Sequence, residues 1–211
     1  MKQESKEKTS RSRILEAACA LFINNGYHGT STREITNQLG LSPSTLYSHF
    51  KTKEEIFVAV LETYHPWLII PSAVENAQGK NVDEIVRSAA DGMLKEWDKQ
   101  PDLIRLHLIE SVEFRGQHLP ELFDNTFKKM TSAVENLIAN NPDLHTINVD
   151  ILTRALLGLF FAYLMTDRYS EVQFRTGLGG SVFDYFTDAY LKGIASQSGI
   201  DSNKKEEKQE K

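Results

Sequence analysis

The chain has 211 residues, of which 40% are hydrophobic and 25% charged, a composition typical of a globular domain with a full core. Its longest apolar run, Ala155–Met165, is far shorter than the roughly 20 residues that a membrane-spanning helix needs, and we expect no signal peptide. A single cysteine, Cys19, excludes an internal disulfide, suits a reducing cytoplasm and is expected in the core.

The formal net charge of −5 is unevenly distributed along the chain. Residues 1–53 carry 8 Lys/Arg against 4 Asp/Glu, and the remainder carries 16 against 25. In a protein with a basic N-terminal part and an acidic body, DNA would attract the basic part and so orient the molecule. A chance distribution of surface charge is the alternative explanation.

Residues 1–10 are polar and charged without periodicity, so we expect a flexible basic arm. The next segment predicts a helix from about Ser10 to Asn24. Its apolar side chains follow the spacing of one buried helical face: Ile14, Ala17, Ala18, Leu21 and Phe22. Asn25 and Gly26 end this helix, and Tyr27 is expected to pack back against it.

The stretch Ser31–Lys53 has the layout of two short helices joined by a tight turn. Ser31 is a good N-cap, and Glu34 stands where its carboxylate completes a capping box. Gly40 suits the left-handed position after the first helix, and Ser42 caps a second helix that opens with a proline. This arrangement is typical of a helix-turn-helix, whose second helix presents its N-terminal residues to the major groove of DNA.

The run from Arg13 to Val60 closely resembles the N-terminal domain of the TetR/AcrR family of bacterial repressors. The resemblance rests on the ILEAACALF helix, the Asn25-Gly26-Tyr27 turn, the Thr30-Ser31-Thr32 lead-in and the sequence LYSHFKTK of residues 46–53. It covers about the first quarter of the chain, and beyond that region it concerns architecture only.

The rest of the chain also has helical patterns, without a convincing period-2 segment. A linking helix is expected over 53–68, with Pro66 ending or kinking it. The predicted helices of the body are 82–97, 101–116, 120–138, 150–168 and 182–194. The fold class is therefore all-α: a three-helix head with a helix-turn-helix, plus a helical-bundle body, about nine helices in all.

The predicted organisation has five segments. They are a flexible basic arm (1–10), a helix-turn-helix DNA-binding domain (11–52), a linking helix (53–68), a ligand-binding and dimerisation domain (69–195) and a disordered tail (196–211).

The resemblance implies that the head binds a double-stranded DNA operator. Contacts to base edges fall to Pro43, Ser44, Thr45 and Tyr47, with Arg33 reaching from the first helix of the motif. Contacts to phosphates fall to Thr32, Tyr47, Ser48, His49 and Lys53. Many relatives carry an aromatic residue in place of Ser48, and solvated helix surface is the alternative for every position.

The resemblance also implies a twofold homodimer through the last two helices, and hence a roughly palindromic operator. The candidate interface residues are Leu157, Gly158, Phe161, Tyr185, Phe186 and Tyr190. Packing within the core of the monomer is the alternative for each of them.

The same resemblance implies that an unknown small-molecule effector binds in the body and releases DNA by tilting the linking helix. The candidate pocket residues are Trp97, His107, Glu110, Phe114 and Tyr163. As alternatives, Glu110 would form a surface salt bridge with Arg105 or Arg115, and the aromatic residues would belong to the core.

The sequence lacks the motifs of an enzyme, a P-loop or a dinucleotide site, and its six His residues are scattered. His107 with Glu110 is an isolated pair, so we expect no catalytic residue, metal or cofactor. The predicted function is a cytoplasmic transcriptional repressor without membrane contact. The alternative is an architectural or cell-division factor of the same fold that binds DNA without a small-molecule inducer.

Overall fold

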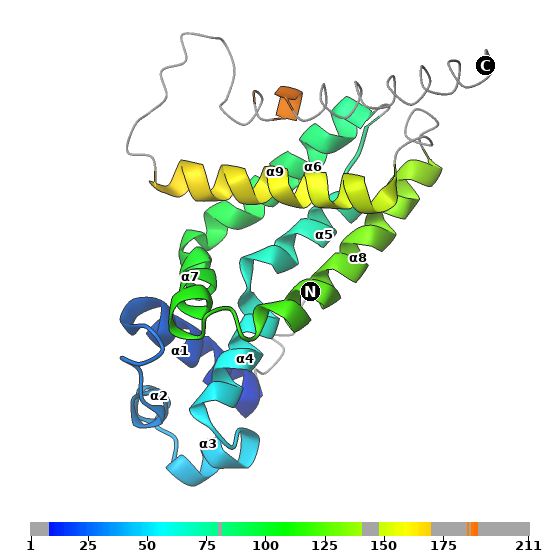
Figure 1. Cartoon of the computed structure of the whole chain (residues 1–211). Coiled ribbons are helices and arrows are strands. Elements are labelled where there is room, and N and C mark those ends of the chain that lie inside the picture. The colour runs from blue at the N-terminus through cyan, green and yellow to red at the C-terminus, as the bar shows by residue number, and fades with distance from the viewer. Residues whose placement is uncertain (1–8, 80–81, 141–147, 170–184, 186, 190–211) are drawn as a thin grey trace, which may run out of the picture. The chain divides into compact units, whose positions relative to one another are not determined.

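A computed structural model describes residues 9–79, 82–140, 148–169, 185 and 187–189, and all regular structure in them is helical (Figure 1). The first four helices are α1 (Ser10–Asn25), α2 (Thr32–Leu39), α3 (Pro43–His49) and α4 (Lys53–Tyr64). The later elements are the 3-10 helix η1 (Pro66–Leu68), α5 (Ile69–Glu75), α6 (Val82–Lys99), the 3-10 helix η2 (Pro101–Leu103), α7 (Ile104–Glu113), α8 (Leu119–Ala139) and α9 (Val149–Tyr169). The predicted all-α fold is confirmed.

The described residues contain nine α-helices, as many as the sequence predicts, but the two sets differ. The sequence pattern does not predict α5, which has Pro71 as its third residue. Proline is tolerated there, since the N–H groups of the first helical turn have no partner within the helix. Of the predicted helix 182–194, only Tyr185 and residues 187–189 are described, and they are helical.

Two compact units make up the structure. The first contains the residues up to Leu68 together with Lys99–Asn125, and the second contains Ile69–Asp98 and the residues from Thr126 onward. The helix α7 therefore belongs with α1–α4, while α8 begins in the first unit and ends in the second. The domain boundaries expected from the sequence remain predictions.

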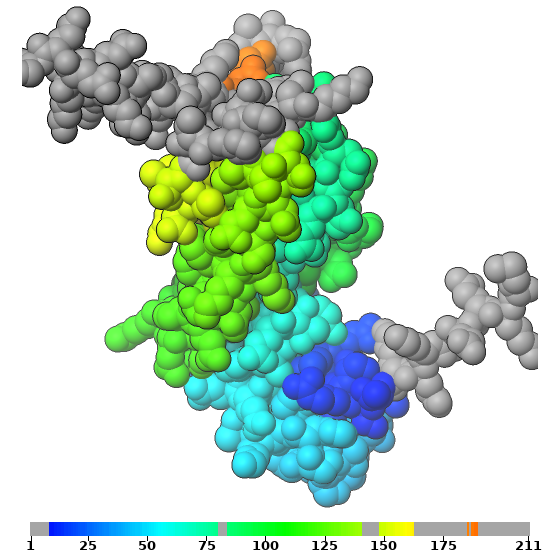
Figure 2. Space-filling model, turned by 90° about the vertical axis from the view of Figure 1, so that its right-hand side faces the viewer, coloured from blue at the N-terminus to red at the C-terminus, as the bar shows by residue number. Residues whose placement is uncertain are grey.

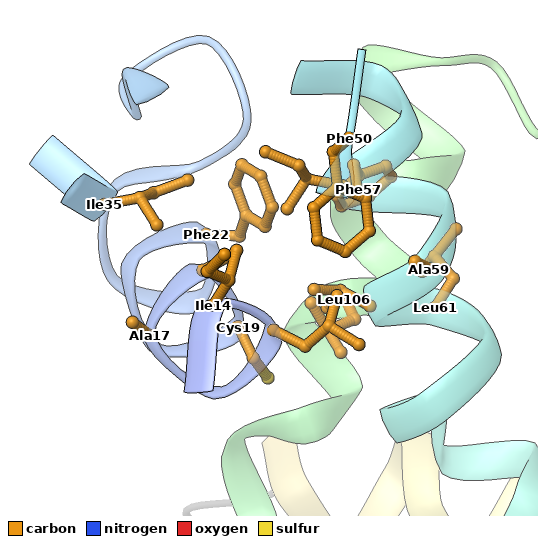
Figure 3. Packing of buried hydrophobic residues seen from close by; sticks show 14 of the residues in the cluster. Ile14, Ala17, Cys19, Phe22, Ile35, Phe50, Phe57, Ala59, Leu61 and Leu106 are labelled. Carbon is orange, nitrogen blue, oxygen red and sulfur yellow. The ribbon is translucent and has the colours of Figure 1, made fainter. Parts of the chain in front are cut away.

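Aromatic rings form the centre of the first unit. Phe57 of α4 meets Phe22 of α1 edge-on at a centroid distance of 5.2 Å (Figure 3), and it stacks on Phe114, the C-cap of α7, at 4.9 Å. Tyr27, which follows α1, contacts these three rings at 4.5–5.8 Å, so it packs back as predicted. Each such pair contributes about 0.5–1.5 kcal/mol beyond the burial of area. Cys19 is buried in the same core, and burial raises the pKa of its thiol to about 12.

The second unit has a more aliphatic core. The buried residues of α6 recur at helical spacing: Ile85, Val86, Ala89, Ala90, Met93 and Trp97. Buried residues also recur at helical spacing on α9: Leu152, Leu156, Leu159 and Phe160. Ile151 at the start of α9 is 55% exposed, so this helix keeps an apolar side chain on its surface.

One described segment, Lys53–Glu75, is long and apolar enough to cross a membrane by length and composition, with a mean hydropathy of 1.2. However, 56% of its most apolar 18-residue stretch is buried inside the protein, and Pro66 and Pro71 lie within the segment. Core helices pass the same test of length and composition, so the segment is weak evidence for a membrane span.

Two imidazole rings meet in the interior of the first unit. His65, the C-cap of α4, accepts a hydrogen bond at Nδ1 from the N–H of Trp67 (3.2 Å), and its Nε2 lies 3.3 Å from Nδ1 of His107. Nε2 of His65 must therefore carry the proton that it donates to His107. Burial, together with the neighbouring His107, lowers the pKa of His65 to about 3, and burial also lowers the pKa of His107.

The aromatic centre predicts a large effect of Phe57→Ala on stability. Phe57 is fully buried, and truncating such a ring typically costs about 3–5 kcal/mol. Urea denaturation measures this loss. Val112→Ala, at a side chain that is 76% exposed, is the control and should change the unfolding free energy by less than about 0.5 kcal/mol. Equal effects of the two substitutions would contradict the description of this core.

The buried His65 predicts a pH dependence of stability. Its folded pKa of about 3 lies below the unfolded value of 6.5, so the unfolded chain binds the extra proton between these pH values, and stability falls as the pH falls. Between pH 7.5 and pH 5, wild type should lose about 2 kcal/mol more unfolding free energy than His65→Gln. Urea titrations of both proteins at each pH check this. If wild type and His65→Gln lost the same unfolding free energy over this pH range, His65 would not be held neutral in the folded protein.

Candidate nucleic-acid interface

Side chains cap both helices of the predicted helix-turn-helix. The Ser31 hydroxyl accepts a hydrogen bond from the N–H of Glu34 (3.2 Å), and the Glu34 carboxylate accepts one from the N–H of Ser31 (2.7 Å). Gly40 has φ 64° and ψ 29°, a left-handed conformation that penalises other residues. Ser42 caps α3 by accepting from the N–H of Thr45 (3.2 Å). The capping box, the glycine turn and the second cap are all confirmed.

Apolar anchors fix one side of this motif. Ile35 of α2 and Leu46 of α3 are fully buried, and Phe50 after α3 is 2% exposed, with the guanidinium of Arg11 lying 5.0 Å above its ring. In the space-filling view, the blue-to-cyan residues of α1–α4 form one close-packed surface (Figure 2). Helices as short as α2 and α3 depend on such packing, and their remaining sides are free to meet a partner.

The predicted DNA-contacting residues lie mainly on the exposed part of the motif. Exposed members are Arg33, Pro43, Ser44, Tyr47, Ser48 and His49, and half-buried members are Thr32, Thr45 and Lys53. Tyr47 is 51% exposed although it is a large aromatic residue. Its hydroxyl lies 3.4 Å from that of Thr32, so the structure brings these two predicted contacts together.

Hydroxyl groups cluster at the start of α3. The Ser42 oxygen lies 2.7 Å from that of Ser44 and 2.9 Å from that of Thr45, and Ser48 donates to the Thr45 carbonyl (2.7 Å). Each hydroxyl has one donor and two acceptor sites, so these contacts leave hydrogen-bonding capacity for a base or a phosphate.

Lys53 at the start of α4 has a structural role that the sequence analysis missed. Its Nζ donates to the carbonyls of Tyr27 and Thr30, both at 2.8 Å, and lies 4.1 Å from the centre of the Tyr27 ring. Burial lowers the pKa of Lys53, while the charges of Glu113 and Glu34 oppose that shift. Two of its three N–H donors go to the carbonyls, which leaves one for a phosphate.

Glu113 is a second residue that the sequence analysis missed. It ends α7, yet its carboxylate accepts hydrogen bonds from the N–H groups of Tyr27 (3.0 Å) and His28 (2.8 Å) in the turn before α2. No local pattern signals a contact between positions 85 residues apart in the sequence.

The predicted pocket residues are distributed over both units. His107, Glu110 and Phe114 belong to the first unit, where Phe114 is part of the aromatic core and His107 pairs with His65. Trp97 of the second unit is buried, and the side chain of Tyr163 lies outside the described residues. The two cavities described below are lined by other residues, so this set remains a prediction.

Glu110 is fully buried, and its partner is His118 instead of an arginine. Its carboxylate accepts from the N–H of His118 (2.7 Å) and lies 2.9 Å from Nδ1 of the same ring. The other ring nitrogen of His118 lies 3.3 Å from the Glu54 carboxylate on α4. The ring therefore connects the corner between α7 and α8 to the start of α4.

Each unit has a groove. In the first unit, a groove of about 640 Å³ runs along α1, the end of α4 and η2, with Cys19, Ile23 and Tyr64 among its lining residues. In the second unit, a groove of about 500 Å³ is lined by residues of α5, α6 and α8 and the segment between α5 and α6: Val74, Glu75, Ala77, Gln78, Gly79, Ile85, Ala133, Asn136, Leu137 and Asn140.

For the proposed dimer interface, the structure describes four of the six candidates. Leu157, Gly158 and Phe161 of α9 and Tyr185 are half-buried, whereas Phe186 and Tyr190 lie outside the described residues. Within the described part of the chain, no group of three or more His, Cys, Asp or Glu side chains is arranged to hold a metal ion.

Bacterial regulatory proteins share sequence with this chain. Residues 14–60 match the sequence pattern of "Bacterial regulatory proteins, tetR family". The uncharacterised HTH-type transcriptional regulator YerO of Bacillus subtilis is 25% identical over 132 residues, which cover 62% of this chain and 44% of YerO. The chain thus spans less than half the length of that relative.

Solved structures share the fold over most of the chain. A TetR-family transcriptional regulator from Mesorhizobium loti has a TM-score of 0.63 at 21% identity, covering 90% of this chain and 98% of its own. The multidrug binding protein EbrR, solved with imidazole, has a TM-score of 0.58 at 18% identity, covering 89% of this chain and 97% of its own. Residues 14–60 thus resemble the corresponding region of tetR-family bacterial regulatory proteins, and 90% of the chain shares its fold with the solved TetR-family structure from Mesorhizobium loti.

Proposed function

We propose that the protein is a homodimeric cytoplasmic repressor that binds a palindromic DNA operator and leaves it when a small molecule binds. The observation that supports DNA recognition best is the capped helix-turn-helix, in which α3 exposes short polar side chains and Tyr47. Helices of this kind enter the major groove with their N-terminal residues against base edges.

In this proposal, α3 and α2 share the contacts to base edges. Pro43, Ser44 and Thr45 stand in the first turn of α3, and Tyr47 follows one turn later. The short hydroxyls hydrogen-bond bases or meet a thymine methyl group, while the exposed Arg33 of α2 donates two parallel hydrogen bonds to guanine. These residues would determine the operator sequence.

The phosphate contacts would determine the register of the protein on DNA. They are assigned to Thr32, Tyr47, Ser48, His49 and Lys53. Because Lys53 also binds the turn before α2, its contact would come from an ammonium group whose position is already set by two carbonyls. An ammonium held in this way loses little side-chain entropy when it meets the phosphate.

The homodimer would form through α9 and the helical residues around Tyr185. The proposed interface contains Leu157, Gly158, Phe161, Tyr185, Phe186 and Tyr190. The half-buried apolar residues of α9 support this, because they are only partly covered within the chain. A twofold dimer reads two inverted half-sites, hence the palindromic operator.

The effector would bind in the body, where the predicted pocket comprises Trp97, His107, Glu110, Phe114 and Tyr163. A groove of about 500 Å³ in the second unit, which is lined by none of these five residues, is also large enough for a small molecule, and its carboxylate and amide groups suit a polar one. EbrR, which has the same fold, is a multidrug binding protein solved in complex with imidazole, and this supports ligand binding by proteins of this architecture. A screen for small molecules that release the operator tests this part.

Selecting bound duplexes from a random DNA library tests the DNA-binding proposal. The selected sequences should be inverted repeats whose half-site centres are about 10–10.5 base pairs apart or a multiple of that spacing. Sedimentation at micromolar concentration should show a dimer. A stable monomer, or selected sequences without symmetry, would contradict the proposal.

The proposed phosphate contact of Lys53 predicts a change in salt dependence. Lys53→Ala should reduce the slope of log affinity against log salt by about 0.9, the value for one lost contact. Titrations of the selected duplex at several salt concentrations measure the slope. Lys95→Ala, an exposed lysine in the second unit, is the control for net charge and should leave the slope unchanged. An unaltered slope for Lys53→Ala would remove Lys53 from the phosphate contacts.

A further inference from the structure

We propose that Glu113, the last residue of α7, is a positioning residue: it holds the start of the helix-turn-helix in the position that DNA binding requires. The inference rests on the DNA-binding role of α2 and α3. Glu113 is far from these helices in sequence, and it acts through the turn of residues 26–30, which leads from α1 into α2.

The turn presents two consecutive backbone N–H groups to the Glu113 carboxylate. One carboxylate oxygen accepts from Tyr27 at 3.0 Å, and the other accepts from His28 at 2.8 Å. The Glu113 side chain is only 20% exposed, so water competes weakly for it. Hydrogen bonds to an ionised acceptor are roughly twice as strong as neutral ones, and two parallel bonds also fix direction.

Gly26 makes this approach possible. Its φ of 76° is a conformation that other residues rarely adopt, and a Cβ there would lie 2.9 Å from the Glu113 carboxylate oxygen. The glycine at the end of α1 therefore serves both the backbone turn and the close contact with α7.

A cation, the ammonium group of Lys53, binds the carbonyl groups of the same turn. Nζ of Lys53 binds the carbonyls of Tyr27 and Thr30 at 2.8 Å, so the turn has an anion on its N–H groups and a cation on its carbonyl groups. The turn ends at Ser31, the N-cap of α2. Consequently, α7 and α4 together define where α2 begins, and α3 packs against α2.

This arrangement makes the end of α7 a control point for DNA binding. If α7 shifts, the Glu113 carboxylate leaves the two N–H groups, and the start of α2 loses one of its two charged restraints. The exposed residues of α3 would then be presented less precisely, although none of them is contacted by Glu113. A change in α7 would thus alter operator affinity without a change in the DNA-contacting residues.

The test compares wild type with Glu113→Gln in titrations of the duplex that wild type selects. Glutamine keeps the size of the side chain but loses the charge and one acceptor oxygen. Affinity should fall about tenfold, the equivalent of one charge-assisted hydrogen bond. The sign of this change in affinity is informative. Removing a negative charge from a protein otherwise increases its affinity for DNA.

Glu62→Gln is the matched control, since Glu62 is an exposed carboxylate on α4 in the same unit. It makes the same change in net charge and should bind the duplex as tightly as wild type or slightly more tightly. Amide hydrogen exchange at Tyr27 and His28 should accelerate in Glu113→Gln and not in Glu62→Gln, with unchanged helical circular dichroism. Equal affinities of Glu113→Gln and wild type would overturn the inference.

A double-mutant cycle with Lys53→Met separates positioning from general destabilisation. If Glu113 and Lys53 act through one turn, the double variant should lose less affinity than the product of the two single losses. Independent losses would overturn the inference. If Glu113→Gln does not fold, Glu113→Asp replaces it, because the shorter carboxylate cannot reach both N–H groups, and the same tenfold loss is expected.

The outcomes distinguish this inference from the proposed function. A wild-type protein that selects no duplex would remove the DNA-binding proposal and the positioning role with it. A wild-type protein that selects a duplex, with Glu113→Gln binding it equally well, would remove the positioning role alone.

Discussion

The stacking of Phe57 on Phe114 is the contact on which the first unit depends. It joins α4 to the end of α7, and Phe22 and Tyr27 add α1 and its following turn to the same cluster. Burial of one such ring is worth about 3–5 kcal/mol when measured by truncation, whereas a hydrogen bond to a charged group contributes about 1.5–3 kcal/mol. Truncating one ring is therefore expected to cost more stability than losing one of these polar contacts, which set direction and register.

This division of roles explains why charged groups lie so close to an apolar core. Glu113 and Lys53 are partly buried, which would be costly for unpaired charges. Each is satisfied by backbone groups of the turn before α2, and the ring of Tyr27 lies beneath the ammonium group. The aromatic cluster joins α4 to α7, so little further entropy is lost when the two side chains meet the turn.

Local chemistry in the sequence predicts the local structure well and the long-range contacts poorly. The capping box of Ser31, the left-handed Gly40 and the apolar stripe of α1 depend on residues within one or two helical turns, and all are observed. In contrast, the bonds from Glu113 to the turn join residues 85 and 86 positions apart, and no spacing rule signals them. The helix α5 is not predicted either, and the structure accommodates its Pro71 because this residue lies in the first helical turn.

The course of α8 and the contacts of Glu113 indicate how small a structural change would be enough to regulate DNA binding. The helix α8 begins in the first unit and ends in the second, so the chain itself connects the groove of the second unit to the corner at His118. The contacts between His118 and the buried Glu110 fix that corner, and Arg115 and Gly116, both with positive φ, form the turn before it. Allosteric coupling is typically about 1–3 kcal/mol, or 5–150-fold in affinity. The loss of a single charge-assisted hydrogen bond at Glu113 is of the same size, so an effector need not unfold the helix-turn-helix to weaken its binding to DNA.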